Sequence, residues 1–240
     1  MQYKLKFNFI GIGSAFNTKL GNTSAFIRNK DSMILVDCGG TVFHRLMELK
    51  LLEGVRQLNI IITHTHPDHV GSLGEVIFYA YYALKIIPKL YFPEIQLMWT
   101  FLRCIGVEEK MVEMVGSQEV EICDQELGEF NLSFLPVSHL PTIPAFGFIL
   151  ENKDSRVYYS GDANEVPESI MKMLEEGSLD IIYQDTCGLD YDDNAHLSVK
   201  NLCEIIPANL RNKVYCIHHD NFFDKEKVKV EGFQVPNIYK

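Results

Sequence analysis

The chain has 240 residues, of which 47% are hydrophobic and 22% are charged, and its formal net charge at pH 7 is −10. This composition is ordinary for a soluble globular protein. No apolar run is long enough to span a membrane, and the first residues lack a signal-peptide pattern. A long polynucleotide is an unlikely partner for so acidic a chain, because non-specific binding depends on Lys and Arg neutralising phosphates.

Six cysteines are scattered along the chain without Cys-x-x-Cys pairs. Without an export signal, this distribution favours free thiols in a reducing compartment, so we expect a cytoplasmic protein.

The first half of the chain alternates apolar strand patterns with helical ones. It predicts strands at residues 4–10, 23–28, 33–36 and 58–62, a helix at residues 41–50 capped by Thr41, and another after Gly74. The 58–62 run is apolar throughout, which indicates a strand buried on both faces. Residues 78–101 are rich in aromatics, which we assign to the core or a subunit interface, with one or two able to stack on a nucleobase.

The second half repeats this order. It predicts strands at residues 115–123, 131–137, 145–150, 156–160, 179–183 and 213–217, and helices at residues 166–175 and 198–206, the latter capped by Ser198. The halves meet near residue 115 without a Pro- or Ser-rich linker. We therefore expect a single domain over residues 1–240, with two similar halves in helix–sheet–sheet–helix layers, an α+β fold.

A cluster of metal-binding residue types follows the 58–62 strand directly. Within six residues the sequence has His64, His66, Asp68 and His69. In extended backbone, His64 and His66 point the same way, whereas Pro67 turns the chain so that the next two face elsewhere. Each pair can hold one cation, and three histidines with a carboxylate favour zinc.

Three more candidate ligands stand where apolar strands end, the usual place for a site in a sheet-based fold. They are His139, Asp162 and His218, with His219 as the alternative to His218. A single histidine at a strand end is more often structural, so their order along the chain is the stronger signal.

This order resembles the metallo-β-lactamase fold superfamily over nearly the whole chain. The resemblance depends on Asp37-Cys38-Gly39, the histidine loop, His139, Ser160-Gly161-Asp162 and His218. It implies a four-layer αββα sandwich with two metal sites: His64, His66 and His139 at the first, Asp68, His69 and His218 at the second, and Asp162 between them. It also implies that Asp37 is buried and orients the histidine loop.

Within the superfamily, Ser-Gly-Asp fits a phosphodiesterase with two metals, and Ala195-His196-Leu197-Ser198 resembles the Ala-His-Ser-Thr motif of ribonuclease Z. The resemblance places His196 close to the scissile phosphate; the alternative is a surface residue before a helix cap. Leu197 departs from the motif, and Asp185 stands where that family has a glutamate. The chain also lacks the glycine-rich basic arm that binds tRNA, which favours a small phosphodiester.

The segments at residues 11–16 and 21–24 resemble the compact cyclic-nucleotide phosphodiesterases of the phage anti-Pycsar type. This resemblance implies hydrolysis of 3′,5′-cyclic mononucleotides such as cCMP and cUMP to linear monophosphates, in evasion of Pycsar-type antiphage signalling. It implies two Zn²⁺ ions, with Mn²⁺ as the alternative, and a homodimer in which an aromatic lid from the partner closes over the site. Asp68 would orient the attacking water, and His196 would assist the leaving group.

Three other functions remain open at this stage. They are a ribonuclease Z-like tRNA 3′-endonuclease, another metal-dependent hydrolase of the same fold, and a non-catalytic sensor that binds a nucleotide without consuming it.

Overall fold

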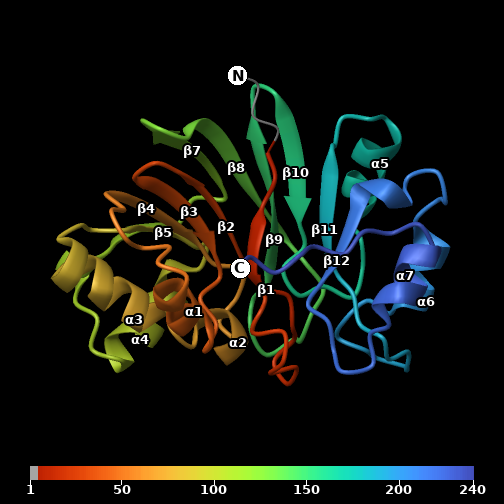
Figure 1. Cartoon of the computed structure of the whole chain (residues 1–240), viewed down its shortest axis with the longest axis horizontal. Helices are drawn as coiled ribbons and strands as arrows, with labels where there is room; N and C mark the ends of the chain where they lie inside the picture. The colour runs from red at the N-terminus through yellow and green to blue at the C-terminus, as the bar shows by residue number, and fades with distance from the viewer. Residues whose placement is uncertain (1–4) are drawn as a thin grey trace.

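The computed structural model describes residues 5–240 and contains two six-stranded sheets (Figure 1). The first sheet has the order β1 (Asn8–Gly11), β2 (Ser24–Asn29), β3 (Ser32–Val36), β4 (Gln57–Ile61), β5 (Lys89–Tyr91) and β6 (Glu113–Val115). The strands from β1 to β3 are antiparallel neighbours, and those from β3 to β6 are parallel. Parallel pairing aligns the carboxyl ends of β3 and β4, which brings the loops after them to one edge of the sheet.

In the second sheet, too, strands that are consecutive in the chain are neighbours. It runs β12 (Val214–Ile217), β11 (Ile181–Asp185), β10 (Ser155–Tyr159), β9 (Phe146–Asn152), β8 (Gly128–Pro136) and β7 (Glu119–Asp124). The strands from β7 to β10 are antiparallel, whereas β10, β11 and β12 are parallel. Each half therefore starts with an antiparallel run and ends with parallel strands.

Helices cover the outer faces of both sheets (Figure 1). On the first sheet lie α1 (Val42–Glu48), α3 (Leu73–Phe78), which continues as the π-helical η1 (Tyr79–Leu84), and α4 (Ile95–Cys104), with the short α2 (Pro67–Val70) at the sheet edge. On the second lie α5 (Glu168–Glu175), α6 (Val199–Ile205) and α7 (Lys225–Val230). Two 3-10 turns, η2 (Glu109–Met111) and η3 (Arg211–Lys213), complete the list. The helix–sheet–sheet–helix layering expected from the sequence is confirmed.

An aromatic core joins the two sheets near their centre. Phe148 stacks on Tyr159 with ring centroids 5.2 Å apart, and the edge of Phe7 meets both rings. The backbone N–H of Phe7 donates to the hydroxyl of Tyr183 at 3.1 Å, which satisfies that buried oxygen. Offset and edge-on aromatic packing of this kind stabilises beyond its buried area, and it holds the two sheets in a fixed relation.

The strand predicted at residues 115–123 is confirmed only from Glu119 onward, because the chain crosses at residues 116–118 from one sheet to the other. It ends β6 at Val115 and begins β7 at Glu119, on the outer edges of different sheets. Gly116 lies against Ile95 at this crossing, where a Cβ atom would come within 2.2 Å of that side chain. Both strands are short, and the three residues between them carry no proline that would mark a break.

Two other expectations on element ends need correction, and one is confirmed. The Thr41 side chain does not cap α1; its hydroxyl instead accepts a hydrogen bond from the backbone N–H of Asn22 at 2.8 Å. The first strand begins at Asn8, and residue 4 of its predicted range lies outside the described residues. Ser198 caps α6 as predicted, because its hydroxyl accepts from Asn201 N–H.

The aromatic segment at residues 78–101 holds β5 and α4, neither of which was predicted. Most of its aromatic side chains are buried or packed against the core, as their residue types favour. Among residues 5–240, no helix has both the length and the apolar character needed to cross a bilayer.

Candidate metal centre and active site

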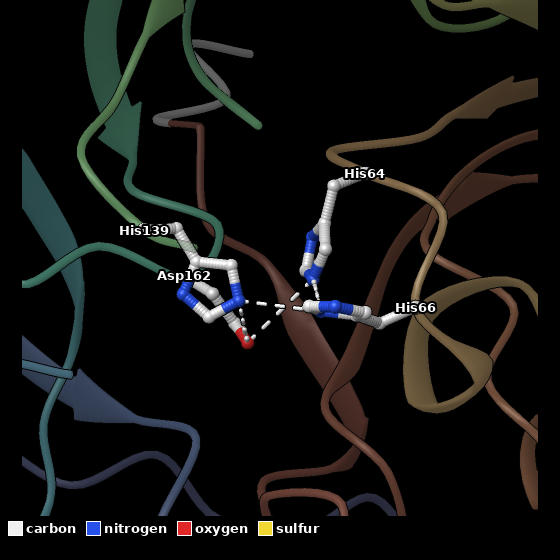
Figure 2. Close-up of side chains that lie close together, drawn as sticks. All are labelled: His64, His66, His139 and Asp162. Atoms are coloured by element: carbon white, nitrogen blue, oxygen red, sulfur yellow. Dashed lines mark hydrogen bonds and ion pairs between the residues drawn. The ribbon is translucent and has the colours of Figure 1, made fainter. Parts of the chain in front are cut away.

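Four candidate ligands from three separate segments converge at one edge of the two sheets (Figure 2). The Nε2 atom of His64 lies 3.0 Å from Nδ1 of His66, which lies 3.2 Å from Nε2 of His139. The Oδ2 atom of Asp162 lies 3.7 Å from His64 Nε2 and 3.8 Å from His139 Nε2. Three nitrogens and one oxygen that face a common point form the donor set of a tetrahedral metal site.

A second set of four lies beside the first and shares Asp162 with it. The Oδ1 atom of Asp162 lies 3.1 Å from Nε2 of His69 and 3.4 Å from Nε2 of His218. The Oδ2 atom of Asp68 lies 3.2 Å from the same His218 nitrogen. The two oxygens of Asp162 thus face different groups of histidines.

Gly161 is required to place Asp162 between the two groups. Its backbone has φ of +60°, and a Cβ atom there would lie 2.7 Å from the carbonyl oxygen of Phe146 and 3.0 Å from Cβ of Thr63. Only glycine fits both the left-handed backbone and the close approach of the two chains. Glycine in the Ser-Gly-Asp segment therefore has a steric reason, and β9, β10 and the histidine loop meet at this point.

Asp37 is fully buried and fixes the orientation of the histidine loop. Its Oδ1 accepts from Thr63 N–H at 2.9 Å, and its Oδ2 accepts from the Thr63 hydroxyl and from Nδ1 of His69, each at 2.9 Å. The proton of His69 is thereby held on Nδ1, which leaves Nε2 to face Asp162. The Thr63 hydroxyl is in turn 3.1 Å from Nδ1 of His64 and acts on that ring in the same way.

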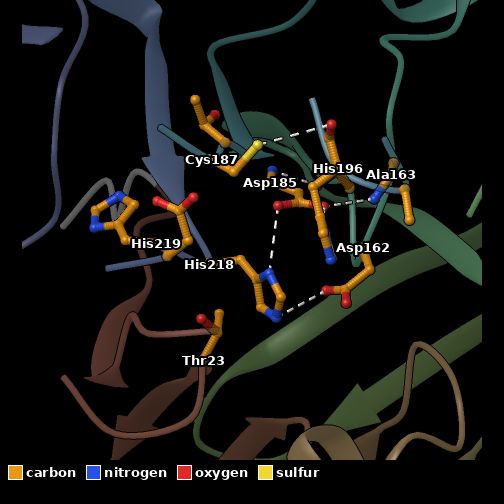
Figure 3. A network of polar contacts seen from close by, with 12 residues as sticks. Thr23, Asp162, Ala163, Asp185, Cys187, His196, His218 and His219 are labelled. Atoms are coloured by element: carbon orange, nitrogen blue, oxygen red, sulfur yellow. Dashed lines mark hydrogen bonds and ion pairs between the residues drawn. The ribbon is translucent and has the colours of Figure 1, made fainter. Parts of the chain in front are cut away.

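His139 and His218 are oriented by similar contacts, whereas His219 is turned away from the site. Nδ1 of His139 donates to the carbonyl oxygen of Ala195 at 3.2 Å, so its Nε2 faces the cluster. His219 stacks on Phe223 and donates from Nε2 to the carbonyl oxygen of Cys216. In Figure 3 its ring points away from Asp162. Of the two adjacent histidines, the structure brings His218 into the cluster.

Asp185 connects His218 to His196 (Figure 3). One oxygen of Asp185 lies 2.7 Å from Nδ1 of His196 and also accepts from Ala163 N–H, while the other lies 3.4 Å from Nδ1 of His218. His196 is therefore held against the cluster rather than free on the surface. The sequence did not predict that Asp185 orients the two histidines. The one signal for it was that Asp185 stands where ribonuclease Z has a glutamate.

The electrostatics of the cluster favour a bound cation. Burial lowers the pKa of His218, but the carboxylates of Asp162 and Asp185 outweigh this effect and raise it to about 10. Burial raises the pKa of Asp162, but the neighbouring histidines outweigh it and hold it well below its ordinary value. Carboxylates that stabilise positive charge on imidazoles also stabilise a divalent cation at the same place.

Unpaired donor atoms give a second reason to expect a metal. Among the described residues, His69 Nε2 and Asp162 Oδ1 are buried 3.1 Å apart, yet neither atom makes a hydrogen bond of good geometry. Buried polar atoms without a hydrogen bond are costly, and a cation bound by both atoms would satisfy them. The histidine nitrogens and carboxylate oxygens present therefore fit a divalent metal centre.

A cavity of about 650 Å³ opens directly onto this cluster. Asp68, His139, Asp162, His196 and His218 all contribute to its wall. Its volume lies in the range of small-molecule sites. None of the aromatic residues at positions 78–101 of the same chain lines it.

Comparison with known proteins identifies the family. The protein-family model described as anti-Pycsar protein Apyc1 matches residues 5–235. The chain belongs to this family. Two curated anti-Pycsar proteins Apyc1 are similar over nearly their whole length. That of Paenibacillus harenae is 24% identical, with 90% of each chain covered. That of Bacillus phage vB_BsuM-Goe3 is 28% identical, with 89% of this chain and 88% of its own covered.

A solved structure supports the fold of this anti-Pycsar family member. The metallo-beta-lactamase fold protein YhfI from Bacillus subtilis superposes with a TM-score of 0.74, and the match covers 96% of this chain and 94% of that one. At 16% identity the likeness concerns the fold alone. The metallo-β-lactamase fold and the anti-Pycsar relationship inferred from the sequence are both confirmed.

Proposed function

We propose that this protein is a metal-dependent phosphodiesterase that hydrolyses 3′,5′-cyclic mononucleotides to linear nucleotide monophosphates. The observation that carries the proposal is the pair of histidine groups facing the two oxygens of Asp162, with His196 beside them in one cavity. The anti-Pycsar names of its relatives support a cyclic nucleotide signal as the substrate. We place the activity in the cytoplasm of a bacterium, or of a host cell infected by phage.

The proposed ligands form two sets that share one carboxylate. His64, His66 and His139 would hold the first Zn²⁺, and Asp68, His69 and His218 the second, with Asp162 between them. A pair of zinc ions, or of manganese ions as the alternative, supplies Lewis-acid stabilisation of the phosphoryl oxygens and a nucleophilic water at neutral pH.

The side chains around the proposed metals have distinct tasks. Asp68, whose pKa is held low because hydrogen bonds from His218 and His69 outweigh its burial, can accept a hydrogen bond from the attacking water and orient it. His196 has Nδ1 held by Asp185, so Nε2 is free to face the substrate in the cavity. Burial lowers the pKa of His196, but the opposing effect of the Asp185 carboxylate is larger, so the pKa is raised overall. This favours the protonated ring as donor to a phosphate oxygen or the leaving alkoxide.

A homodimer is also proposed, by analogy with the compact phosphodiesterases that the sequence resembles. Light scattering coupled to size exclusion would test it. An elution mass near 27.5 kDa, the mass of one chain, would contradict the homodimer without affecting the metal site.

The function itself is tested by incubating zinc-loaded and manganese-loaded protein with a panel of phosphodiesters and separating the products. The panel contains cyclic mononucleotides, cyclic dinucleotides and a precursor tRNA. We expect conversion of cyclic mononucleotides to linear monophosphates. Cleavage of the tRNA alone, with steep salt dependence, would favour the ribonuclease alternative, and binding without turnover would favour a sensor.

A further inference from the structure

The mouth of the 650 Å³ cavity carries exposed apolar side chains on two loops. Phe16 is 86% exposed and Tyr191 is 58% exposed, and both line the cavity that holds Asp162 and His196. Aromatic rings are usually at least half buried in a folded chain, so their exposure beside a polar cluster marks a surface for an apolar part of a ligand.

The loop of Phe16 is fixed to the strand end that carries the second histidine group. Ser14 N–H donates to the carbonyl oxygen of His219 at 3.0 Å, and Asn17 Nδ2 donates to the carbonyl oxygens of His219 and Asp220, each at 3.1 Å. Asn17 N–H closes the turn onto Ser14 at 3.1 Å. Although its side chain is exposed, Phe16 therefore has a backbone held in place relative to the metal ligands.

The loop of Tyr191 is fixed to the same point. The carboxylate of Asp220 accepts from Gly188 N–H at 2.9 Å and from Leu189 N–H at 3.2 Å. Asn194 Nδ2 donates to the carbonyl oxygen of Leu189 at 3.1 Å and closes the base of the loop. Asp220 thus connects both loops to the end of the strand, which holds the two aromatic residues at the same cavity.

The charge of the cavity wall limits what the rest of the ligand can be. Among the described residues, no Lys or Arg lines this cavity, whereas Asp68, Asp162 and Asp220 do. One phosphate can be held at the metal cluster, but a second phosphate would have no cationic side chain to neutralise it. The part of the ligand that reaches the mouth must therefore carry no negative charge, and the exposed rings favour a flat group.

We propose that Phe16 and Tyr191 bind the nucleobase of a cyclic mononucleotide by stacking while its phosphate lies at the metal cluster. This inference rests on the proposed function and adds the residues that recognise the base. Stacking of a base on an aromatic side chain contributes about 1–3 kcal/mol, which corresponds to about 5- to 150-fold in binding. The contact is the same in the ground state and the transition state, so its loss raises KM and leaves kcat nearly unchanged.

The test compares Phe16→Ala and Tyr191→Ala with the unaltered protein, with Val230→Ala as the control. Val230 is as exposed as Phe16, at 87%, but lies at the end of α7 and does not line the cavity. Two substrates are used: a 3′,5′-cyclic pyrimidine mononucleotide and methyl ribofuranoside 3′,5′-cyclic phosphate, which has the same phosphodiester ring and no base. Since both target residues are exposed, circular dichroism and thermal melting should be unaffected by the changes.

For the nucleotide, we expect each cavity variant to raise KM about tenfold or more while kcat changes less than threefold. The base-free substrate should be turned over by the variants as efficiently as by the unaltered protein. Phe16→Tyr and Tyr191→Phe, which keep the ring, should restore the original KM, and Val230→Ala should have no effect.

An unchanged KM in both alanine variants would overturn the base contact while leaving the proposed function in place. An equal loss on both substrates would also overturn it, because the effect would then come from the loops and not from the base. If the unaltered protein turned over neither substrate, the proposed function and the base contact would both fail.

Discussion

Nδ1 of His196 lies 2.7 Å from an oxygen of Asp185, a buried carboxylate whose other oxygen faces Nδ1 of His218. One carboxylate therefore orients two histidines with different proposed tasks, a metal ligand and a proton donor. His196 belongs to neither proposed set of metal ligands and is held at the site by Asp185. Its effect on the rate can therefore be measured separately from metal binding.

His196→Ala should lower kcat about 10²-fold while zinc content, measured by mass spectrometry of the metal, stays unchanged. The reason is that the residue donates to the phosphate or leaving group and belongs to neither proposed set of metal ligands. The matched control is His44→Ala, since His44 is exposed on α1 and does not line the cavity. Full activity in the His196 variant would remove this residue from the mechanism.

Asp185→Asn should behave differently, because it weakens the contacts that orient two histidines at once. The change keeps the size of the side chain but removes the negative charge that His196 and His218 face. We expect about a 10- to 100-fold loss in both zinc affinity and turnover, which is the usual cost of losing a group that orients a metal ligand. Competition with a chelator gives the affinity, and an unaltered zinc affinity would show that His218 does not depend on Asp185.

Gly161→Ala should disrupt the site through the backbone alone. A Cβ atom there would lie 2.7 Å from the carbonyl oxygen of Phe146, so the strand end that carries Asp162 must move. Gly177→Ala is the matched control, because Gly177 also has a left-handed backbone, with φ of +75°, but has nothing within 4 Å of an added Cβ. Both variants lose about 1 kcal/mol from the left-handed conformation, and only Gly161→Ala should also lose zinc. Equal zinc content in the two variants would contradict this.

The stability of the chelator-treated protein should fall as the pH rises from 7 to 8.5. The pKa of His218 in the folded chain is raised from 6.5 to about 10, so its contribution is complete below pH 6.5 and is lost progressively toward pH 10. In zinc-loaded protein the same nitrogen binds the metal in place of a proton, so the slope should be smaller. Melting temperatures measured at both conditions test the difference, and equal slopes would contradict it. The window ends at pH 8.5 because buried thiols such as Cys216, with a pKa raised to about 12, destabilise above pH 9.

The fold and the positions of the candidate ligands could be predicted from the sequence because they depend on spacing within short segments and on the order of motifs along the chain. Three histidines and an aspartate lie in one loop, and the alternation of side chains along extended backbone is enough to interpret their spacing. His139, Asp162 and His218 each follow an apolar strand, and parallel pairing brings such ends to one edge. The element types were therefore mostly correct, but the crossing between β6 and β7 is marked by a single glycine, Gly116, and a single glycine also occurs inside strands at bulges.

What sequence could not supply is the set of contacts between distant segments. Thr63 meets Asp37 only because β3 and β4 pair in a particular register, and Asp185 meets His196 through the turn before α6. The cavity mouth is built by Phe16 and Tyr191, from loops 175 positions apart in sequence that Asp220 holds together. The dense aromatic segment at residues 78–101 was the more conspicuous pattern, but it packs mainly against the first sheet.

The central claim is that Asp162 lies between two cations, and anomalous diffraction from crystals of zinc-loaded protein tests it most directly. Data collected on both sides of the zinc absorption edge should show two peaks about 3.5–4 Å apart. We expect one peak among His64, His66 and His139 and the other among Asp68, His69 and His218, each next to a different oxygen of Asp162. A single peak, or zinc bound away from Asp162, would contradict the two-metal site on which the proposed phosphodiesterase depends.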